Sequence, residues 1–281
     1  MRDRWGRIGR NRQAGVLARG RVGMRDVLER VARGELSPAA AEAELRGYTT
    51  LDAGRFDADR ERRTGIPEGI LAEGKTPAET AALAAAALET TGHALVTRVA
   101  PADATAVRRV LAAETPDASV AWDERGRTVV AHGPAYEPPS LSASVGVVTA
   151  GTSDAQPARE AVTVAREMGA GIRLVEDVGV ASIDRLLDSL PTVREPDVLV
   201  VAAGREGALP TVVAGLVDAP VIGLPVPTGY GHGGAGEAAL SGMLQSCTPL
   251  TVVNVGAGFT AGAQAGLVAR AVAGARDDGA D

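Results

Sequence analysis

The chain of 281 residues lacks the residues on which several classes of protein depend. Its only cysteine is Cys247, so no internal disulfide can form, and a lone thiol fits a reducing compartment. It has no apolar run of about eighteen residues, which argues against a membrane-spanning helix. Its first residues show no secretory signal pattern. We therefore expect a cytoplasmic protein with no membrane partner.

Basic residues are scarce over most of the chain. Lys75 is the only lysine, and from residue 31 onward 32 acidic residues stand against 20 basic ones. A nucleic-acid-binding protein needs a basic face to meet phosphates, so this balance argues against a nucleic-acid partner. We expect small molecules as ligands instead.

The chain also lacks a conventional zinc motif. Its three histidines, His93, His132 and His232, are scattered, and with one cysteine they match no ligand spacing. We expect no metal site from them. There is also no Walker motif and no Ser–His–Asp signature, so the sequence leaves any metal ligands unknown.

The first half predicts a small α+β domain over residues 24–133. The arginine-rich residues 1–23 before it are interpreted as a disordered extension, with a basic arm or a targeting peptide as alternatives. Ser37 and Pro38 mark the start of the second of two helices expected within 24–46. The further elements expected are a helix at 77–91, a strand at 94–99, a helix at 103–114 and a hairpin at 120–131.

A proline-rich linker at 134–143 leads into a regular alternation of strands and helices. Valine-rich strands without polar alternation are typical of a sheet covered on both faces. We therefore predict an α/β fold over 144–275, a five-stranded doubly wound parallel sheet with the flavodoxin-like order 2-1-3-4-5, and a tail at 276–281. The strands are expected at 144–150, 172–175, 197–203, 221–224 and 250–255, and the helices at 156–168, 182–190, 207–217, 236–245 and 258–275.

A small-residue turn follows the first strand of this sheet and opens a helix. It consists of Gly151, Thr152, Ser153 and Asp154. Backbone N–H groups at a helix start attract phosphate, and the two hydroxyls add donors. Asp154 could instead cap the helix. We expect this turn at the ligand site, because ligands bind at the carboxyl ends of parallel strands.

A second glycine-rich turn, residues 229–236, follows the fourth strand. It contains a GxGxxG pattern that begins at Gly229 or Gly231. The acidic residue that a dinucleotide fingerprint requires further on is missing, so the pattern alone is weak. A flexible loop explains it as well as a second phosphate cradle does.

Lys75 lies in a polar segment, residues 51–80, in which acids and arginines alternate. A charge run of this kind is usually a solvated surface of ion pairs. Here the sole lysine stands between Gly74 and Thr76, in a turn sequence that could hold a phosphate or carboxylate. The two interpretations are about equally good.

Cys247 is predicted at the end of a helix, before the fifth strand. A single cysteine is usually a small buried hydrophobe, and a helix C-terminus is an unfavourable place for a thiolate. The position is also at the opposite edge of the sheet from the glycine turns. A catalytic Cys247 would therefore need an oligomer that brings this edge to the turns of another subunit.

Segments from both domains together resemble the LarB family, the pyridinium-3,5-biscarboxylic acid mononucleotide synthases of nickel-pincer cofactor biosynthesis. The C-terminal domain is also similar to the PurE family of aminoimidazole ribonucleotide carboxylases, which assemble as octamers. The resemblance covers about residues 24–275. The matching segments are RFDADRERRTGIPEGILAEGKTPAET, VGVVTAGTSD, VEDVGVAS, VVAAGREGALPTVVAGLV and GEAALSGMLQSCTPLTVVNVGAGF.

The resemblance implies carboxylation of the pyridinium ring of nicotinic acid adenine dinucleotide by CO2 or bicarbonate. Hydrolysis of the phosphoanhydride would release AMP, Mg²⁺ would be the cofactor, and the protein would be a homo-oligomer, an octamer by analogy with PurE. The implied catalytic residues are Cys247 as nucleophile, Glu206 as acid/base and Ser153. The substrate-binding residues that we expect are Gly151, Thr152, Asp154, Asp177, Gly207, Lys75, Gly229 and Gly231.

The sequence departs from the PurE pattern at two positions. Ala208 stands where PurE enzymes have a histidine before a Leu-Pro pair, and Asp184 precedes Arg185 where relatives have a histidine. Both changes argue against a PurE-type carboxylase or mutase, which remains one alternative. A non-catalytic nucleotide-binding module is another alternative, and it would need neither Cys247 nor Glu206.

Overall fold

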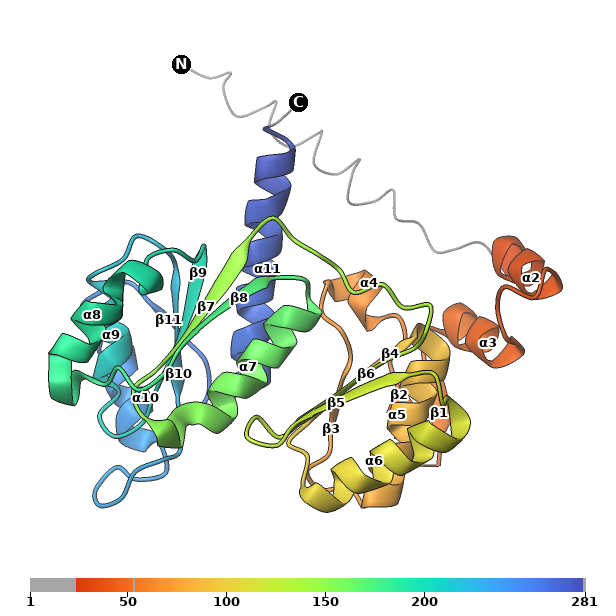
Figure 1. Ribbon diagram of the computed structural model, residues 1–281, viewed down its shortest axis with the longest axis horizontal. Coiled ribbons are helices and arrows are strands. Elements are labelled where there is room, and N and C mark those ends of the chain that lie inside the picture. The colour runs from red at the N-terminus through yellow and green to blue at the C-terminus, as the bar shows by residue number, and fades with distance from the viewer. Residues whose placement is uncertain (1–23, 53, 280–281) are drawn as a thin grey trace, which may run out of the picture.

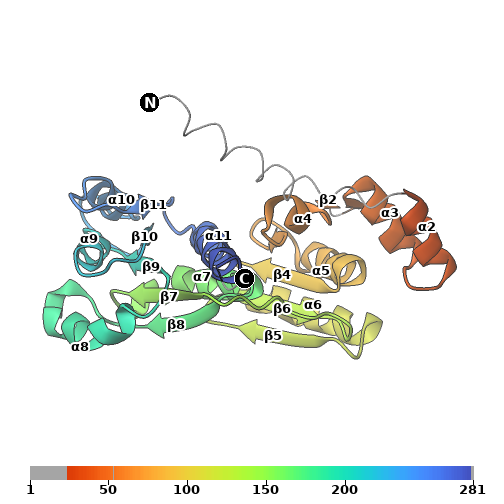
Figure 2. The ribbon, with the colours of Figure 1, turned by 90° about the horizontal axis from the view of Figure 1, so that it is seen from above.

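The computed structural model describes residues 24–52 and 54–279 and shows two domains side by side (Figures 1 and 2). The extension expected at residues 1–23 lies outside the described part. Within that part, no helix combines the length and the apolar character needed to cross a membrane.

The N-terminal domain begins with the two expected helices, α2 (Met24–Ala32) and α3 (Pro38–Arg46). Ser37 caps α3, because its hydroxyl oxygen accepts the Ala40 N–H at 3.1 Å. An antiparallel pair of short strands and one short helix follow, namely β1 (Thr49–Leu51), β2 (Gly54–Phe56) and α4 (Arg60–Thr64).

A four-stranded sheet of order β3-β4-β6-β5 forms the centre of this domain. Its strands are β3 (Gly69–Leu71), β4 (His93–Thr97), β5 (Ser119–Asp123) and β6 (Thr128–His132), and two adjacent helices, α5 (Pro77–Thr91) and α6 (Pro101–Glu114), pack on it. The expected hairpin is confirmed as the antiparallel pair β5 and β6. Helix α5 has the expected bounds, because Thr76 and Glu79 cap its start reciprocally and Gly92 ends it at φ 72°.

The pairing of β4 with β6 contradicts the expectation that the three histidines are scattered in the structure. His93 and His132 are direct cross-strand partners, so two of the three histidines are close in space. The sequence spacing is misleading because a helix and a hairpin lie between the two residues, and the sheet register alone brings them together.

The C-terminal domain confirms the predicted α/β fold. Its five strands pair in parallel in the order β11-β10-β9-β7-β8, which is the expected 2-1-3-4-5. The strands are β7 (Ser144–Thr149), β8 (Gly171–Val175), β9 (Val198–Ala203), β10 (Val221–Pro225) and β11 (Thr251–Val252). The last strand is shorter than expected.

Helices cover both faces of this sheet. One face carries α7 (Ala155–Glu167), which follows the short 3-10 turn η1 (Thr152–Asp154), and α11 (Gly258–Asp277). The other face carries α8 (Ile183–Val193), which follows η2 (Val180–Ser182), α9 (Ala208–Ala214) and α10 (Glu237–Leu244).

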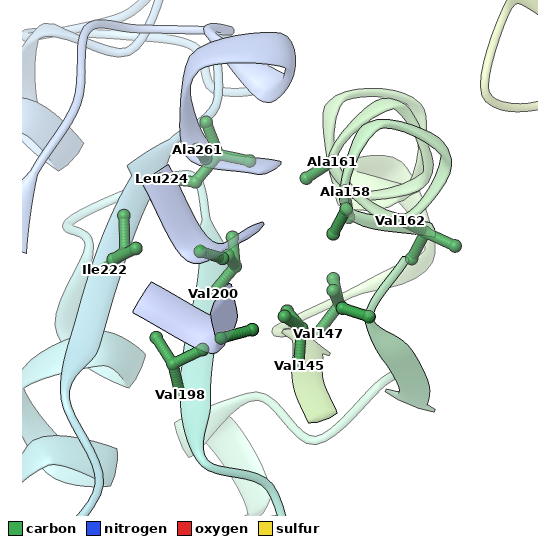
Figure 3. Close-up of a cluster of buried hydrophobic side chains, with 14 of the residues drawn as sticks. Val145, Val147, Ala158, Ala161, Val162, Val198, Val200, Ile222, Leu224 and Ala261 are labelled. Carbon is green, nitrogen blue, oxygen red and sulfur yellow. The ribbon is translucent and has the colours of Figure 1, made fainter. Parts of the chain in front are cut away.

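The core under α7 and α11 is built from small and β-branched side chains (Figure 3). Alternate valines of one strand point into it, as Val145 and Val147 do, because side chains alternate along a strand. The two helices approach so closely that a Cβ at Gly262 would lie 2.5 Å from the Ala161 carbonyl oxygen. Small residues therefore set the helix spacing on this face.

The two domains share a further apolar cluster. Leu95 and Val130 from the N-terminal sheet pack with Val164 and Met168 of α7 and with Ala263 of α11. Helices α7 and α11 accordingly lie between the two sheets (Figures 1 and 2). This buried contact fixes the position of one domain against the other.

Glu160 of α7 is buried at this domain contact, with 1% of its surface exposed. Burial raises the pKa of its carboxyl group, although the Arg98 guanidinium acts in the opposite direction. The Thr97 hydroxyl and the Phe259 N–H lie close enough to favour the charged form, but neither carboxylate oxygen accepts a well-aligned hydrogen bond. The charged form is therefore poorly compensated.

Replacing Glu160 by glutamine is expected to stabilise the protein at neutral pH. A raised pKa means that the folded state holds the proton more tightly than the unfolded state, so wild-type stability falls as pH rises above the ordinary value of 4.5. The variant should unfold a few °C higher at pH 7, for a gain of about 1 kcal/mol. The gain should vanish near pH 3, well below the ordinary value of 4.5, because the carboxyl group is then protonated in both the folded and the unfolded wild type.

Thermal unfolding at both pH values measures this effect. Glu114→Gln, at the exposed end of α6, is the matched control and should unfold as the wild type does at both. A Glu160→Gln protein that is no more stable than the wild type at pH 7 would contradict the account.

Candidate active site

A cavity of about 520 Å³ opens at the carboxyl ends of β7, β8, β9 and β10. This is the edge at which parallel sheets bind ligands. Four turns line it, and each follows a strand. Their lining residues include Gly151, Ser153, Asp154, Gly179, Val180, Arg185, Gly204, Arg205, Glu206, Thr228, Gly229 and Tyr230.

Asp154 organises the first of these turns. It is only 3% exposed, and its carboxylate accepts the Gly151 N–H at 2.8 Å and the Thr228 hydroxyl at 3.0 Å. Burial raises the pKa of Asp154, and these hydrogen bonds oppose that effect. The Asp154 side chain therefore forms no capping bond with α7, although the sequence allowed one. Its carboxylate instead reaches back to the turn after β7 and joins it to the turn after β10.

Ser153 and Thr152 have different positions. Ser153 lines the cavity, and its hydroxyl donates a long hydrogen bond of 3.4 Å to Asp154. Thr152 is exposed and does not line the cavity, and its carbonyl accepts a hydrogen bond from Arg125 of the N-terminal domain at 3.4 Å. Of the two residues whose hydroxyls were expected at the site, Ser153 therefore lines the cavity and Thr152 does not.

Glu206 lies in the turn after β9, and the backbone of this turn packs tightly against α10. The next residue, Gly207, has φ 68°, and a Cβ there would lie 2.5 Å from the Ala239 carbonyl oxygen of α10. Only glycine fits this contact, so Gly207 serves packing rather than lining the cavity. The Glu206 carboxylate forms no ion pair or hydrogen bond with another residue of the described chain, so it is available to a ligand.

Two arginines, Arg185 and Arg205, were missing from the residues expected at the site. The Arg205 guanidinium lies 4.5 Å from the ring centre of Tyr230, a cation–π contact at the cavity rim. Arg185 lines the cavity and pairs with Asp177 at 2.8 Å. Asp177 itself does not line the cavity, but its carboxylate pairs with an arginine that does. Arg205 could have been expected at the site from the sequence, because it directly precedes Glu206.

Two other expected residues lie outside the cavity. The Lys75 ammonium group is in the N-terminal domain, where it donates to the Leu71 carbonyl at 2.7 Å. Gly231 is exposed in the turn 229–236, and only the beginning of that turn, including Gly229, reaches the cavity.

Cys247 is exposed, so its interpretation as a buried hydrophobe is wrong. It lies three residues after the end of α10, before β11, at the amino edge of the sheet. Its neighbour Thr248 donates a hydrogen bond to the Thr211 carbonyl within α9. Cys247 is not among the residues that line the cavity. Within the described chain, Cys247 therefore lies outside the cavity that Glu206 lines.

Large apolar side chains are exposed near both places. Ile183 and Leu187 of α8 are 41% and 47% exposed, Leu244 near Cys247 is 65% exposed, and Tyr230 at the cavity is 83% exposed. Exposed apolar groups in clusters mark interaction surfaces. Exposed apolar side chains therefore lie both beside the cavity and near Cys247.

Replacing Asp154 by alanine is expected to weaken substrate binding. The change leaves the Gly151 N–H and the Thr228 hydroxyl without their acceptor, which costs about 1–3 kcal/mol and loosens two cavity turns at once. We expect KM for an anionic substrate to rise by roughly tenfold or more. Steady-state kinetics measure the change.

Asp103→Ala is the matched control, because Asp103 is also buried and accepts the Ala100 N–H at 2.8 Å, but at the start of α6. It should lower stability and leave KM unchanged. If both variants raised KM alike, general destabilisation would explain the effect and the positioning role of Asp154 would be wrong.

Comparison with known proteins matches both domains. Residues 48–133 match the model of the LarB/PurE-like N-terminal domain, and residues 144–280 match that of AIR carboxylase. A protein of Methanocaldococcus jannaschii, itself uncharacterized, is 34% identical over 253 residues, which span 88% of this chain and 97% of that protein. The likeness therefore covers both domains in the same order.

Proposed function

The chain belongs to the LarB family, with a PurE-like C-terminal domain, and from that premise we propose that it carboxylates the pyridinium ring of nicotinic acid adenine dinucleotide. Hydrolysis of the phosphoanhydride then releases AMP and pyridinium-3,5-biscarboxylic acid mononucleotide. The family supports a carboxylase-type enzyme. The observation that supports the proposal is that one cavity brings together the turn of residues 151–154, two arginines and Glu206, which has no partner in the described part of the chain.

The cavity suits a dinucleotide with a diphosphate. The turn of residues 151–154 lies before α7, where the helix dipole favours negative charge. The Gly151 N–H is held by Asp154, but the Ser153 hydroxyl makes only a long bond of 3.4 Å to that carboxylate, so it is the donor of this turn that can turn to a phosphate. Arg185 and Arg205 add positive charge at the rim. We propose that these groups hold the diphosphate and leave the pyridinium ring toward Glu206.

The proposed chemistry begins at the ring. A pyridinium cation is too electron-poor to attack CO2. The Cys247 thiolate adds to C4, and the ring becomes a neutral dihydropyridine with a nucleophilic C5. C5 then bonds to the carbon of CO2, which becomes a carboxylate, and the ring nitrogen regains its positive charge.

Glu206 completes the substitution. Its carboxylate accepts the proton from C5, the electron pair of that C–H bond returns to the ring, and the C4–S bond breaks to release the thiolate. The ring is again aromatic, and its only net change is the replacement of C5–H by a carboxylate. Glu206 suits this role because it lines the cavity and has no partner in the described chain.

Magnesium is the proposed cofactor for the phosphoanhydride step. Mg²⁺ in such sites is held by one or two carboxylates together with substrate phosphates, and when bound it neutralises phosphate charge. Asp177 lies just outside the cavity and pairs with Arg185, and its carboxylate would be free to hold the ion once a substrate phosphate takes its place on that arginine. Arg185 itself would neutralise one phosphate oxygen and orient the anhydride for attack by water.

We propose that the complete site forms between subunits. Cys247 stands at the amino edge of the sheet, so the nucleophile would be Cys247 of the partner subunit. The exposed Leu187 and Leu244 support this, because apolar surface lies near both halves of the site. An octamer is the assembly that we propose, and the cytoplasm is its compartment, where a lone thiol remains reduced.

A product assay tests the proposed reaction. Pure protein with the dinucleotide, bicarbonate and Mg²⁺ should yield AMP and a mononucleotide with one additional carboxylate, both seen by mass spectrometry. Aminoimidazole ribonucleotide, the PurE-type substrate, should not react. Turnover of that ribonucleotide alone would support the PurE-type alternative. Tight binding of the dinucleotide without any product would support a non-catalytic module.

A further inference from the structure

The domain contact contains a cluster of ligating side chains outside the candidate active site. His93 of β4 and His132 of β6 are cross-strand partners in the N-terminal sheet, with ring centres 5.4 Å apart. Glu167 is the last residue of α7 in the other domain and faces both rings. Among the residues that the structure describes, this is the group of histidines and acids with converging ligand atoms.

The three side chains converge on one point. Glu167 Oε2 lies 2.7 Å from His132 Nε2 and 3.1 Å from His93 Nε2, and the ligand atoms are all within 4.8 Å of one another. His93 and Glu167 are only 5% and 6% exposed. His93 Nε2 is buried and makes no well-aligned hydrogen bond, although it is 3.1 Å from the carboxylate. A buried ring nitrogen of this kind needs a partner.

We propose that His93, His132 and Glu167 bind a divalent transition-metal ion of the zinc class. Two imidazole nitrogens and one carboxylate oxygen are a donor set that such ions prefer, whereas Mg²⁺ and Ca²⁺ prefer oxygen ligands alone. Three protein ligands leave a fourth position for water. His132 is partly exposed, which gives the ion a path from solvent.

Tyr136 holds the two imidazole rings in place. Its ring stacks on both imidazoles, with centres 5.1 Å from His93 and 5.0 Å from His132. Stacked rings cannot rotate freely, so the two Nε2 atoms remain directed at Glu167. A ligand set held in this way loses little conformational entropy when an ion binds.

The ion would link the two domains. Two ligands come from the N-terminal sheet and one from α7, so bound metal would stabilise their arrangement. The site is separate from the active-site cavity, which adjoins the start of α7. That helix has 13 residues, so its ends are about 20 Å apart. The role that follows is structural, and it is independent of the proposed carboxylation.

Titration of the chelator-treated full-length protein with Zn²⁺, followed by calorimetry, tests the proposal. We expect one ion per chain and a higher unfolding temperature with Zn²⁺ present. His132→Ala and Glu167→Gln should each weaken binding by about 100-fold or more, since even outer partners of metal ligands contribute 10–100-fold. His232→Ala is the matched control, because His232 is exposed in the turn 229–236, and it should bind as the wild type does.

Cobalt spectroscopy distinguishes this site from an adventitious one at Cys247. Co²⁺ bound by nitrogen and oxygen should show visible ligand-field bands without a thiolate charge-transfer band. Circular dichroism shows whether the variants remain folded. The proposal is wrong if the wild type binds no Zn²⁺ saturably, if both variants bind like the wild type, or if Co²⁺ reports a thiolate ligand. The first result would mean that Glu167 only accepts hydrogen bonds from the two histidines.

Discussion

Replacing Cys247 by alanine is expected to lower kcat for carboxylation by on the order of 10³-fold or more, as loss of a covalent nucleophile does in other enzymes. Without thiolate addition the pyridinium ring has no nucleophilic carbon, so no CO2 can be attached. Cys247 is exposed, so the change should alter stability by less than about 0.5 kcal/mol. Mass spectrometry of the products measures the loss.

Two controls show whether the loss of activity is due to the Cys247 thiol and whether that thiol acts in the site of another subunit. Ser246→Ala changes the neighbouring residue, whose hydroxyl donates to the Thr248 carbonyl, and it should retain most of the activity. Oligomers that mix Cys247→Ala subunits with Glu206→Gln subunits should regain part of the activity if each site takes one residue from each of two chains. A Cys247→Ala protein with normal carboxylation would rule out the covalent mechanism.

Replacing Glu206 by glutamine is expected to lower kcat by about 10²–10⁴-fold, the usual contribution of a general base. Glutamine keeps the size of the side chain and cannot accept the proton from C5. Glu206 makes no hydrogen bond or ion pair within the described residues, so the fold and the affinity for the dinucleotide should change little. Steady-state kinetics and calorimetric binding of the dinucleotide separate the two quantities.

A deuterium isotope effect shows whether Glu206 acts in the removal of the C5 proton. Substrate carrying deuterium at C5 should react more slowly than normal substrate in Glu206→Gln, because removal of that hydrogen becomes rate-limiting. Glu237→Gln, at the exposed start of α10, is the matched control and should behave as the wild type. If Glu206→Gln turned over at the wild-type rate, or lost activity only through a higher KM, Glu206 would not be the base.

The order of the parallel sheet could be predicted because its strands are short valine-rich runs between glycine turns. The last strand shows the limit of that pattern. The apolar run at 250–255 predicts six residues, but only Thr251 and Val252 pair with β10. Asn254 ends the ladder, because its side-chain oxygen accepts the Val255 N–H at 2.8 Å. Side-chain competition for backbone groups is hard to foresee from one sequence.

The site was predictable only in part, for a related reason. Turn residues such as Ser153 could be placed at the correct edge of the sheet, because strand direction decides the edge. Which side chains face the cavity depends on contacts between turns, such as the bond from Thr228 to Asp154. Arg185 was missed, although the missing histidine beside it was noticed. The position of Cys247 relative to a second subunit remains a prediction.

The measurement that tests the central claim most directly uses ¹³C-bicarbonate with the unmodified protein, nicotinic acid adenine dinucleotide and Mg²⁺. Mass spectrometry and NMR would follow the label. The account predicts a labelled carboxylate at C5 of the pyridinium ring, in a mononucleotide formed together with an equal amount of AMP. Unlabelled product, or folded protein that releases AMP with no new ring carboxylate, would contradict it.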